Sequence, residues 1–322
     1  MKLILGTNKY SGKPLEIIQS VLPAQFEYKM LEEQTEECFI RSVREADYIL
    51  AGGRTRITKA VLDHAKNLKM IQRSGVGLDS LDLNAIREKG IPLYVNQGIN
   101  AQSVAEHALL LMLASLRRLP VIDRNTKNGI WKKQEQGVRT AELRGKTIGI
   151  IGMGNIAKKL VALLKPFRVQ IVYNNLMKEP TEFEQENNMR FAGMDELLQV
   201  SDIVTLHCSL TDATRGLINA ASVQKMKQGA VLINTARGPM VDPQAVAEAL
   251  RSGKLSFAGL DVHEKEPLPE GYPLKDVDNV ILTPHVAGVT YDSFRAMMEA
   301  AFHNIDCFEK GETAEIETFK YL

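Results

Sequence analysis

Residues 143 to 157 read LRGKTIGIIGMGNIA, and the second half of the chain is built around this stretch. An apolar run, Thr147 to Ile151, leads into Gly152 and Gly154, and a helical pattern extends from Asn155 to Leu164. Strand, glycine turn and helix follow in the order that a dinucleotide site requires. Gly152 permits a tight turn, and Gly154 leaves room where a pyrophosphate must approach the backbone.

The start of the predicted helix supports the same interpretation. Its backbone N–H groups and the positive end of its dipole favour a bound phosphate. Ala157 takes the third glycine position of the motif, where a methyl group still lets helix and strand pack closely. An ordinary strand-to-helix turn is the alternative, and the ordered context favours the dinucleotide site.

Composition narrows the class of protein. The 322 residues suffice for two domains of ordinary size. With 40 basic and 39 acidic residues, the chain lacks the net charge that attracts nucleic acid or an anionic membrane, so we expect neither as a partner. The longest purely apolar run, Ala108 to Ala114, is much shorter than the roughly 20 residues of a membrane-spanning helix.

The three cysteines, Cys38, Cys208 and Cys307, are far apart and odd in number. Their spacing predicts no disulfide framework, and no cluster in the sequence has metal-ligand spacing, so we expect no metal site. A reducing compartment is the simplest setting, and we predict a cytoplasmic location.

Residues 1 to 99 alternate short apolar strands with helical patterns, which is typical of a parallel sheet covered by helices. We predict strands at 3–5, 26–30, 48–50, 70–72 and 93–95, and helices at 14–20, 36–44, 58–65 and 83–89. Ligands of such sheets gather at the carboxyl ends of the strands. Two glycine-containing loops follow strands there, at 52–56 and 73–79.

These two loops differ in what they offer a ligand. Gly75 and Gly77 of the second loop can bring backbone N–H groups together, which suits a carboxylate. The alternative, that they only let the chain turn, is equally compatible with the sequence. In the first loop, Arg54 and Arg56 are most simply explained as solvated surface side chains.

From residue 100 to residue 119 the sequence predicts one long helix that is apolar on more than one face. Such a helix must be buried between domains or between subunits, so we place a domain boundary near residue 100. The polar segment 120–139 contains the only tryptophan, Trp131. This segment either packs on a neighbouring chain or forms a plain surface loop, and the sequence leaves both open.

After the glycine motif, strands and helices again alternate, as in a doubly wound domain. We predict strands at 170–173, 203–206, 230–233, 257–260 and 280–282, and helices at 194–200 and 243–252. At the end of the second strand, Asn174 stands where a carboxylate commonly binds the adenosine ribose. Asparagine can still bind ribose but does not repel a 2′-phosphate. NAD is therefore favoured as the cofactor, with NADP as the alternative.

A last helical pattern, 289–310, carries its apolar residues in one stripe and ends before Gly311. We expect this helix to return to the first domain, which then becomes discontinuous in sequence. The predicted substrate-binding domain consists of 1–99 and 289–322, and the predicted dinucleotide-binding domain of 100–288.

Three residues of the second half are candidates for catalysis: Arg237 in INTARGPMVD, Glu266 in AGLDVHEKEP and His285 in LTPHVAG. Singly, each has a structural explanation, as an ion-pair partner, a surface acid and a strand cap. Together they match what reduction of a 2-oxo acid needs. A cation must hold the carboxylate and polarise the carbonyl, and an acid must protonate the new alkoxide. Arginine supplies the first, and a histidine paired with a carboxylate supplies the second.

The sequence resembles the D-isomer-specific 2-hydroxyacid dehydrogenase family over essentially its whole length. The similar segments are RSGVGLDSLDL (73–83), NAQSVAEHALLLML (100–113), ELRGKTIGIIGMGNIA (142–157), LHCSLTDATRGLIN (206–219), INTARGPMVD (233–242), GLDVHEKEP (259–267) and TPHVAG (283–288). The resemblance implies an oxidoreductase that transfers a hydride between NAD(P)H and a small 2-oxo acid to give the D-2-hydroxy acid. It also implies two doubly wound α/β domains, a Rossmann nucleotide-binding domain and a flavodoxin-like substrate domain with a cleft between them, and a homodimer.

By the same resemblance, Arg237 binds the substrate, His285 is the acid/base and Glu266 is its partner. The backbone clamp for the substrate falls on Val76 and Gly77, and Arg54 lies where phosphoglycerate dehydrogenases of the family present basic residues. Cofactor contacts are expected from Ser103, Gly152, Gly154, Asn155, Ile156, Asn174, Cys208, Thr235, Ala236 and Asp261.

One retained residue and one replaced residue bear on these expectations. Glu266 is kept where formate dehydrogenases of the family have glutamine, which argues against formate as the substrate. Asn174 replaces the usual aspartate, which unsettles the choice between NAD and NADP. Two alternatives remain: a dinucleotide-sensing interaction protein similar to transcriptional corepressors of this architecture, and a dehydrogenase of an inorganic oxyanion such as phosphite.

Overall fold

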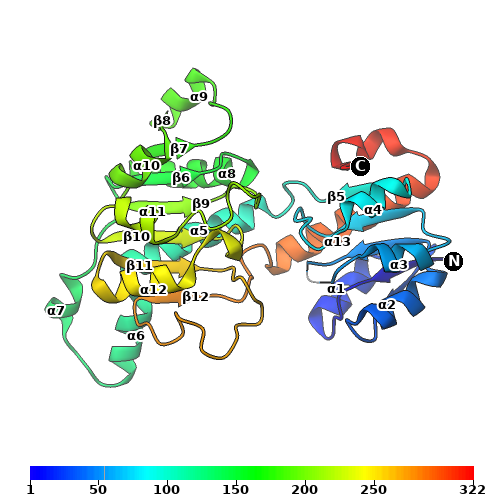
Figure 1. Ribbon diagram of the computed structural model, residues 1–322, viewed down its shortest axis with the longest axis horizontal. Coiled ribbons are helices and arrows are strands. Elements are labelled where there is room, and N and C mark those ends of the chain that lie inside the picture. Colours follow the sequence, from blue (N-terminus) through cyan, green and yellow to red (C-terminus); the bar gives the residue numbers. More distant parts are fainter. Residues whose placement is uncertain (54) are drawn as a thin grey trace. The chain divides into compact units, whose positions relative to one another are not determined.

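The computed structural model describes residues 1–53 and 55–322, which divide into two compact units. Unit 1 consists of Met1–Asn100 and Val289–Leu322, and unit 2 of Ala101–Gly288 (Figure 1). Unit 1 is discontinuous because the long helix α13 (Tyr291–Lys310) packs against α1 (Lys13–Val21) near the start of the chain. Within the described residues, no helix is both long enough and apolar enough to cross a membrane.

Unit 1 contains a five-stranded, fully parallel sheet in the order β2-β1-β3-β4-β5. The strands are β1 (Lys2–Gly6), β2 (Phe26–Met30), β3 (Tyr48–Ala51), β4 (Met70–Arg73) and β5 (Leu93–Val95). This is the flavodoxin-like strand order, and the prediction of such a domain is confirmed. Strands 48–51 and 70–73 are buried throughout, because helices cover both faces of the sheet.

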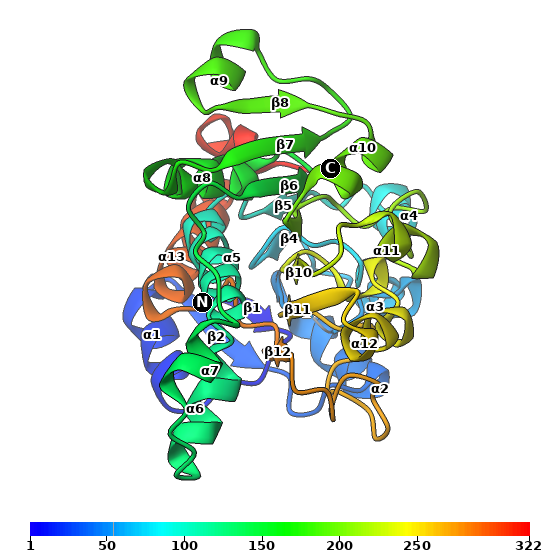
Figure 2. The ribbon, with the colours of Figure 1, turned by 90° about the vertical axis from the view of Figure 1, so that its left-hand side faces the viewer.

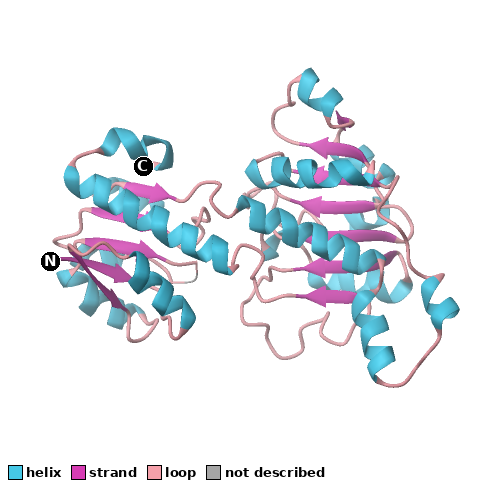
Figure 3. Ribbon diagram, turned by 180° about the vertical axis from the view of Figure 1, so that it is seen from behind, coloured by secondary structure: helices cyan, strands magenta, loops and turns pink. Residues whose placement is uncertain are grey.

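The helices of unit 1 form two hydrophobic cores, one on each face of the sheet. α1 and α13 lie on one face, and α13 runs along the sheet (Figure 3). The opposite core contains residues of α2 (Glu36–Ser42), α3 (Lys59–His64), α4 (Leu83–Glu88) and the 3-10 helix η1 (Val43–Glu45). A further 3-10 helix, η4 (Thr313–Phe319), follows α13.

Unit 2 contains a seven-stranded, fully parallel sheet in the order β12-β11-β10-β9-β6-β7-β8. The strands are β6 (Thr147–Ile151), β7 (Gln170–Asn174), β8 (Met189–Phe191), β9 (Ile203–Leu206), β10 (Ala230–Asn234), β11 (Leu255–Leu260) and β12 (Val280–Leu282). The chain moves outward from β6 in both directions, so the order reverses between β6 and β9. Ligands of doubly wound sheets bind at the carboxyl ends of the strands beside such a reversal.

Helices cover both faces of this second sheet. α5 (Ala101–Leu116) and α8 (Asn155–Leu164) pack together on one face, whereas α10 (Met194–Val200), α11 (Ala220–Lys225) and α12 (Pro243–Ser252) cover the other (Figure 2). The remaining short elements are α9 (Thr181–Glu186), η2 (Lys165–Phe167) and η3 (Gly238–Met240). The doubly wound Rossmann prediction is confirmed for this unit.

Local sequence explains where the long return helix begins and ends. The Thr290 side chain accepts a hydrogen bond from the Ser293 N–H, and the Ser293 hydroxyl accepts one from the Thr290 N–H, which caps the first turn of α13. Gly311 takes a left-handed conformation with φ 81°, which terminates the helix. The helix therefore begins two residues later than predicted and stops at the predicted glycine.

The segment 120–139, for which a plain surface loop was one expectation, contains helical structure instead. α6 (Leu119–Lys127) and α7 (Lys133–Gly137) occupy most of it, and neither helix has a buried residue. Trp131 lies between them and is 82% exposed. The apolar residues of this segment are few, and none in α6 or α7 is buried in the single chain, so polar composition outweighed the helical spacing in the prediction.

Candidate active site

The turn between β6 and α8 is shaped by its two glycines. Gly152 has φ 92°, and a Cβ atom there would lie 2.5 Å from the backbone nitrogen of Cys208, so only glycine fits. A Cβ atom on Gly154 would meet no atom within 4 Å. No side chain caps α8, so the N–H groups of Asn155 and Ile156 in its first turn have no partner among the described residues. Open space and unpartnered donors fit the pyrophosphate of a dinucleotide.

The loops after β9 and β10 adjoin this turn. Cys208 directly contacts the backbone of Gly152, and the Thr235 hydroxyl is buried without a hydrogen-bond partner in the described structure. Ala236 is partly buried and follows Thr235 in the loop. An unpartnered buried hydroxyl is costly, which suits a position that gains a partner from a bound ligand.

His207 is a residue that the sequence analysis missed. Its Nε2 atom lies 2.9 Å from the Thr205 hydroxyl, whereas its Nδ1 atom is buried without a partner among the described residues. Burial lowers the pKa of His207 to about 4, so the ring is neutral at neutral pH. Its position directly after a buried strand, beside the reversal of strand order, was the signal that could have found it.

Asn174 at the end of β7 already has a protein partner. Its side-chain amide donates to the Ala192 carbonyl at 2.8 Å. The neighbouring Asn175 accepts a hydrogen bond from the Met153 N–H inside the glycine turn at 3.3 Å. Asn175 therefore braces the turn, and the expected ribose contact of Asn174 stays a prediction.

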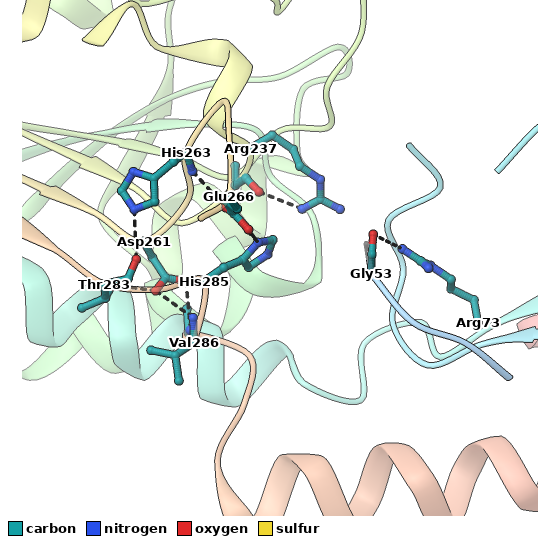
Figure 4. Close-up of polar contacts among 11 residues, drawn as sticks. Gly53, Arg73, Arg237, Asp261, His263, Glu266, Thr283, His285 and Val286 are labelled. Atoms are coloured by element: carbon teal, nitrogen blue, oxygen red, sulfur yellow. Dashed lines mark hydrogen bonds and ion pairs between the residues drawn. The ribbon is translucent and has the colours of Figure 1, made fainter. Parts of the chain in front are cut away.

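Asp261 organises the loop that follows β12. Its fully buried carboxylate accepts hydrogen bonds from the Thr283 hydroxyl at 2.6 Å and from the N–H groups of Val286 and Ala287, both at 2.9 Å (Figure 4). Ser103 on α5 also holds this loop, because its hydroxyl donates a hydrogen bond to the Ala287 carbonyl at 2.7 Å. Both residues, predicted as cofactor contacts, thus hold in place the loop that carries His285.

His285 and Glu266 meet within unit 2. The Nδ1 atom of His285 lies 2.9 Å from Oε2 of Glu266, and the two side chains are 44% and 17% exposed (Figure 4). His285 has a positive φ of 58°, and its N–H donates to the Asp261 carbonyl at 2.7 Å. A non-glycine residue rarely adopts this conformation, and it occurs here at a candidate catalytic position. The Nε2 atom of His285 has no partner in the part of the chain that the structure describes.

Arg237 is positioned by a tight turn after β10. The buried Asn234 side chain spans this turn, accepting from the Ala236 N–H and donating to the Arg237 carbonyl, both at 2.9 Å. The guanidinium of Arg237 donates to the Ala236 carbonyl at 2.7 Å and is drawn on the same side as the His285 ring (Figure 4). Asn234 is a second residue that the sequence analysis missed, because nothing in its spacing distinguishes it from other strand-end residues.

Gly238 brings the Arg237 turn against the loop that carries Glu266. A Cβ atom on Gly238 would lie 2.0 Å from the carbonyl carbon of His263, so the two backbones touch. The His263 N–H donates to Oε1 of Glu266 at 3.0 Å, and its ring nitrogen Nε2 donates to the Thr283 carbonyl at 3.0 Å. His263, which the sequence ranks below His285, is therefore a positioning residue. It contacts the turn that carries Arg237 and the side chain of Glu266.

In unit 1, a buried arginine organises the two loops that the sequence singles out. Arg73, at the end of β4, donates to the carbonyl groups of Gly52, Gly53 and Gly77. It therefore fixes the loop containing Val76, whose N–H, like that of Gly77, has no partner in 1–53 and 55–322. Two adjacent free N–H groups suit a carboxylate.

The two arginines predicted in the first of these loops have different outcomes. Arg54 lies outside the described residues, so its predicted substrate contact stays a prediction. Arg56 is exposed, as expected of a solvated side chain.

Comparison with known proteins identifies the family. A family model described as "D-isomer specific 2-hydroxyacid dehydrogenase, NAD binding domain" matches residues 109–287. A glyoxylate reductase from Thermofilum pendens is 39% identical over 278 residues, which cover 86% of this chain and 82% of that protein. A hydroxypyruvate reductase from Thermotoga maritima is 37% identical over 80% of this chain and 82% of its own length.

A solved structure supports the same conclusion. The D-lactate dehydrogenase from Aquifex aeolicus, in complex with NAD and lactic acid, is 27% identical and has a TM-score of 0.86. The superposition covers 99% of this chain and 98% of that one. These relatives favour neither the interaction protein nor the oxyanion dehydrogenase. The chain is an NAD-dependent oxidoreductase that acts on the CH–OH group of a hydroxy acid, and it belongs to the D-isomer-specific 2-hydroxyacid dehydrogenase family.

Proposed function

We propose that Arg237, Glu266 and His285 catalyse the reduction of a small 2-oxo acid to its D-2-hydroxy acid. The observation that carries this assignment is the 2.9 Å contact between His285 Nδ1 and Glu266 Oε2. It lies in the same unit as the glycine turn, whose open space and free N–H groups fit a dinucleotide.

The proposed chemistry follows from these side chains. Glu266 accepts a hydrogen bond from the Nδ1–H group of His285 and fixes the orientation of the ring. The Nε2 atom is then left to protonate the substrate oxygen. Arg237 holds the substrate carboxylate through its planar guanidinium and polarises the carbonyl group. When bound, NADH would supply a hydride, a hydrogen nucleus with two electrons, to the carbonyl carbon. The carbonyl oxygen thus becomes a hydroxyl with the proton from His285.

Each unit has a proposed role. Unit 2 binds the cofactor through Gly152, Gly154 and the first turn of α8. In unit 1, the N–H groups of Val76 and Gly77 lie in the loop that Arg73 holds, and they suit a carboxylate. The relatives named for glyoxylate and hydroxypyruvate make these two small oxo acids the first candidates for the substrate.

The direct test is turnover of the full chain with a panel of 2-oxo acids, using glyoxylate, hydroxypyruvate, pyruvate and bulkier oxo acids with both nicotinamide cofactors. We expect activity with NADH to exceed that with NADPH. His285→Ala should lower kcat by about 10²–10⁴-fold, the usual contribution of a positioned acid/base group. NADH affinity should stay unchanged, because His285 is not part of the glycine turn.

The matched control is His64→Ala, which changes a partly exposed histidine on α3 in the other unit and should keep full activity. Full activity of the His285→Ala variant would refute the assigned role. No turnover with any oxo acid, despite tight NADH binding, would instead favour the dinucleotide-sensing interaction protein.

We also propose that two copies of the chain associate through α5, α6 and α7. Leu110, Leu119 and Trp131 are 54%, 52% and 82% exposed. A mainly apolar hollow of about 320 Å³ lies among Leu110, Leu113, Ala114, Arg117, Leu119 and Ile122. Exposed apolar groups around such a hollow mark an interaction site, and the resemblance implies a homodimer.

A cytoplasmic setting is supported by three cysteines that are all free.

A further inference from the structure

Three side chains with different donor atoms gather at the end of α13, in unit 1 and outside the proposed catalytic residues. The Sγ atom of Cys307 lies 3.5 Å from Nε2 of His303 and 4.0 Å from Oε2 of Glu315. The donor atoms of all three residues lie within 4.8 Å of one another. Among the residues that the structure describes, this is the one group of three histidine, cysteine or acidic side chains that converges in this way.

The backbone preforms this arrangement. His303 and Cys307 are four residues apart on α13 and therefore share one face of the helix. After Gly311 the chain reverses, and the Glu312 N–H donates to the Cys307 carbonyl at 2.8 Å. η4 then packs back against α13 and is anchored by Ile316, which is completely buried in the same core as Cys307. Glu315, next to this anchor, is thereby held near the thiol.

The electrostatic surroundings of the cluster favour a cation. Three acidic side chains, Glu315, Glu312 and Asp306, and one basic side chain, Lys310, lie around the Cys307 thiol. Lys310 is itself paired with Asp306 at 2.7 Å. Because Asp306 neutralises Lys310, the carboxylates of Glu312 and Glu315 leave the cluster with a negative potential that attracts a positive ion. A bound divalent cation would replace the thiol proton and compensate the negative charge of the surrounding carboxylates.

We propose that His303, Cys307 and Glu315 form a binding site for Zn²⁺. Tetrahedral zinc bonds of about 2.3 Å to sulfur and about 2.0 Å to nitrogen place these two atoms about 3.5 Å apart. The observed separation of Sγ and Nε2 is 3.5 Å and that of Sγ and Nδ1 is 3.8 Å, so the exposed imidazole turns about its Cβ–Cγ bond to direct Nε2 at the ion. A thiolate with an imidazole selects zinc over magnesium or calcium, and a water molecule completes the fourth position. Binding releases the thiol proton and joins α13 to η4.

The sequence predicts no metal site, because the third ligand, Glu315, does not follow from the spacing of the other two. The spacing of His303 and Cys307 is a known helical arrangement for two metal ligands. Glu315 joins them only through the chain reversal at Gly311, which sequence spacing does not reveal.

The test is titration of the untagged, reduced full chain with Co²⁺ and then with Zn²⁺. We expect one Co²⁺ per chain, a near-ultraviolet absorption band from sulfur-to-cobalt charge transfer, displacement by Zn²⁺, and release of a proton on binding. Cys307→Ser should abolish the band. His303→Gln and Glu315→Gln should each weaken Zn²⁺ affinity by at least tenfold, since losing a group that only supports a ligand already costs about 10–100-fold.

Two matched controls keep this test specific. Cys38→Ser removes the other buried cysteine of unit 1, and His64→Gln removes a partly exposed helical histidine of the same unit; both variants should bind Co²⁺ like the unmodified chain. Absence of the charge-transfer band, or an unchanged band in His303→Gln, would overturn the proposal. Because His303 and Glu315 are exposed, their variants decide the question even if Cys307→Ser misfolds.

Discussion

At the scale of single residues, Gly238 matters because it lets two functional loops touch. An added methyl group would lie 2.0 Å from the His263 carbonyl carbon, which belongs to backbone and cannot rotate away. We expect Gly238→Ala to displace Arg237, to lower kcat/KM by at least tenfold, and to reduce the free energy of unfolding by about 1–3 kcal/mol. Steady-state kinetics and urea denaturation measure these effects.

Gly193→Ala is the matched control for this substitution. An added methyl group at Gly193 meets no atom within 4 Å, and the residue has an ordinary φ of −64°. Its kinetics and stability should match those of the unmodified chain. Unchanged kcat/KM in Gly238→Ala would contradict the proposed role of the contact with His263.

His207, whose Nδ1 atom is buried, makes the free energy of unfolding depend on pH. Its pKa is lowered by burial from 6.5 to about 4, so the unfolded chain binds a proton in this interval that the folded chain does not. The free energy of unfolding should therefore fall by about 3 kcal/mol as the pH decreases from 6.5 to 4. His207→Gln removes this titration. Over the same pH interval, the free energy of unfolding of the variant should therefore fall by about 3 kcal/mol less than that of the unmodified chain.

Chemical denaturation of both proteins at several pH values measures this effect. Parallel pH dependence of the two proteins would show that His207 is protonated equally in the folded and unfolded states, contrary to its burial.

At the scale of elements, the two glycines of the turn between β6 and α8 have different roles: Gly152 is needed for stability and Gly154 for cofactor binding. Gly154 has an ordinary φ of −84°, and a methyl group there meets no protein atom within 4 Å. Gly154→Ala should melt like the unmodified chain, yet bind NADH at least tenfold more weakly, because the methyl group occupies the space proposed for the pyrophosphate. NADH fluorescence titration and thermal melting test both statements.

Gly152→Ala provides the contrast within the same turn. Its φ of 92° and the 2.5 Å approach to the Cys208 nitrogen should lower stability by about 1–3 kcal/mol. Normal NADH affinity in Gly154→Ala would place the pyrophosphate elsewhere.

At the scale of the whole molecule, the exposed apolar side chains of α5 and α6, together with Trp131, predict self-association. The chain has a mass of 35.8 kDa, and sedimentation should give twice this value. Leu110→Ser and Trp131→Ser should each weaken association by at least tenfold, because both side chains are more than half exposed in the single chain. Leu176→Ser, which changes another fully exposed leucine of unit 2, should leave the mass unchanged.

A chain that sediments as a monomer at every concentration would contradict the proposed homodimer. In that case the exposed Trp131 and Leu110 would need another partner.

The sequence by itself determined most of the elements, because apolar periodicity and helix caps are local in the chain. The strand at 147–151 and the helices at 155–164 and 194–200 were predicted with the boundaries that the structure has. The missed elements β8, α9 and α11 are short and expose most of their residues, so their patterns carry little signal.

Only the tertiary structure decided which residues support the candidate site. Asn234, His263 and Asp261 act through hydrogen bonds to loops that converge from different strands, and the approach of Gly238 to His263 joins segments 25 residues apart in the chain. The meeting of Glu315 with His303 likewise depends on a chain reversal. The physical reason is that periodicity records which face of an element is buried, whereas a contact between two loops depends on how distant strands pair.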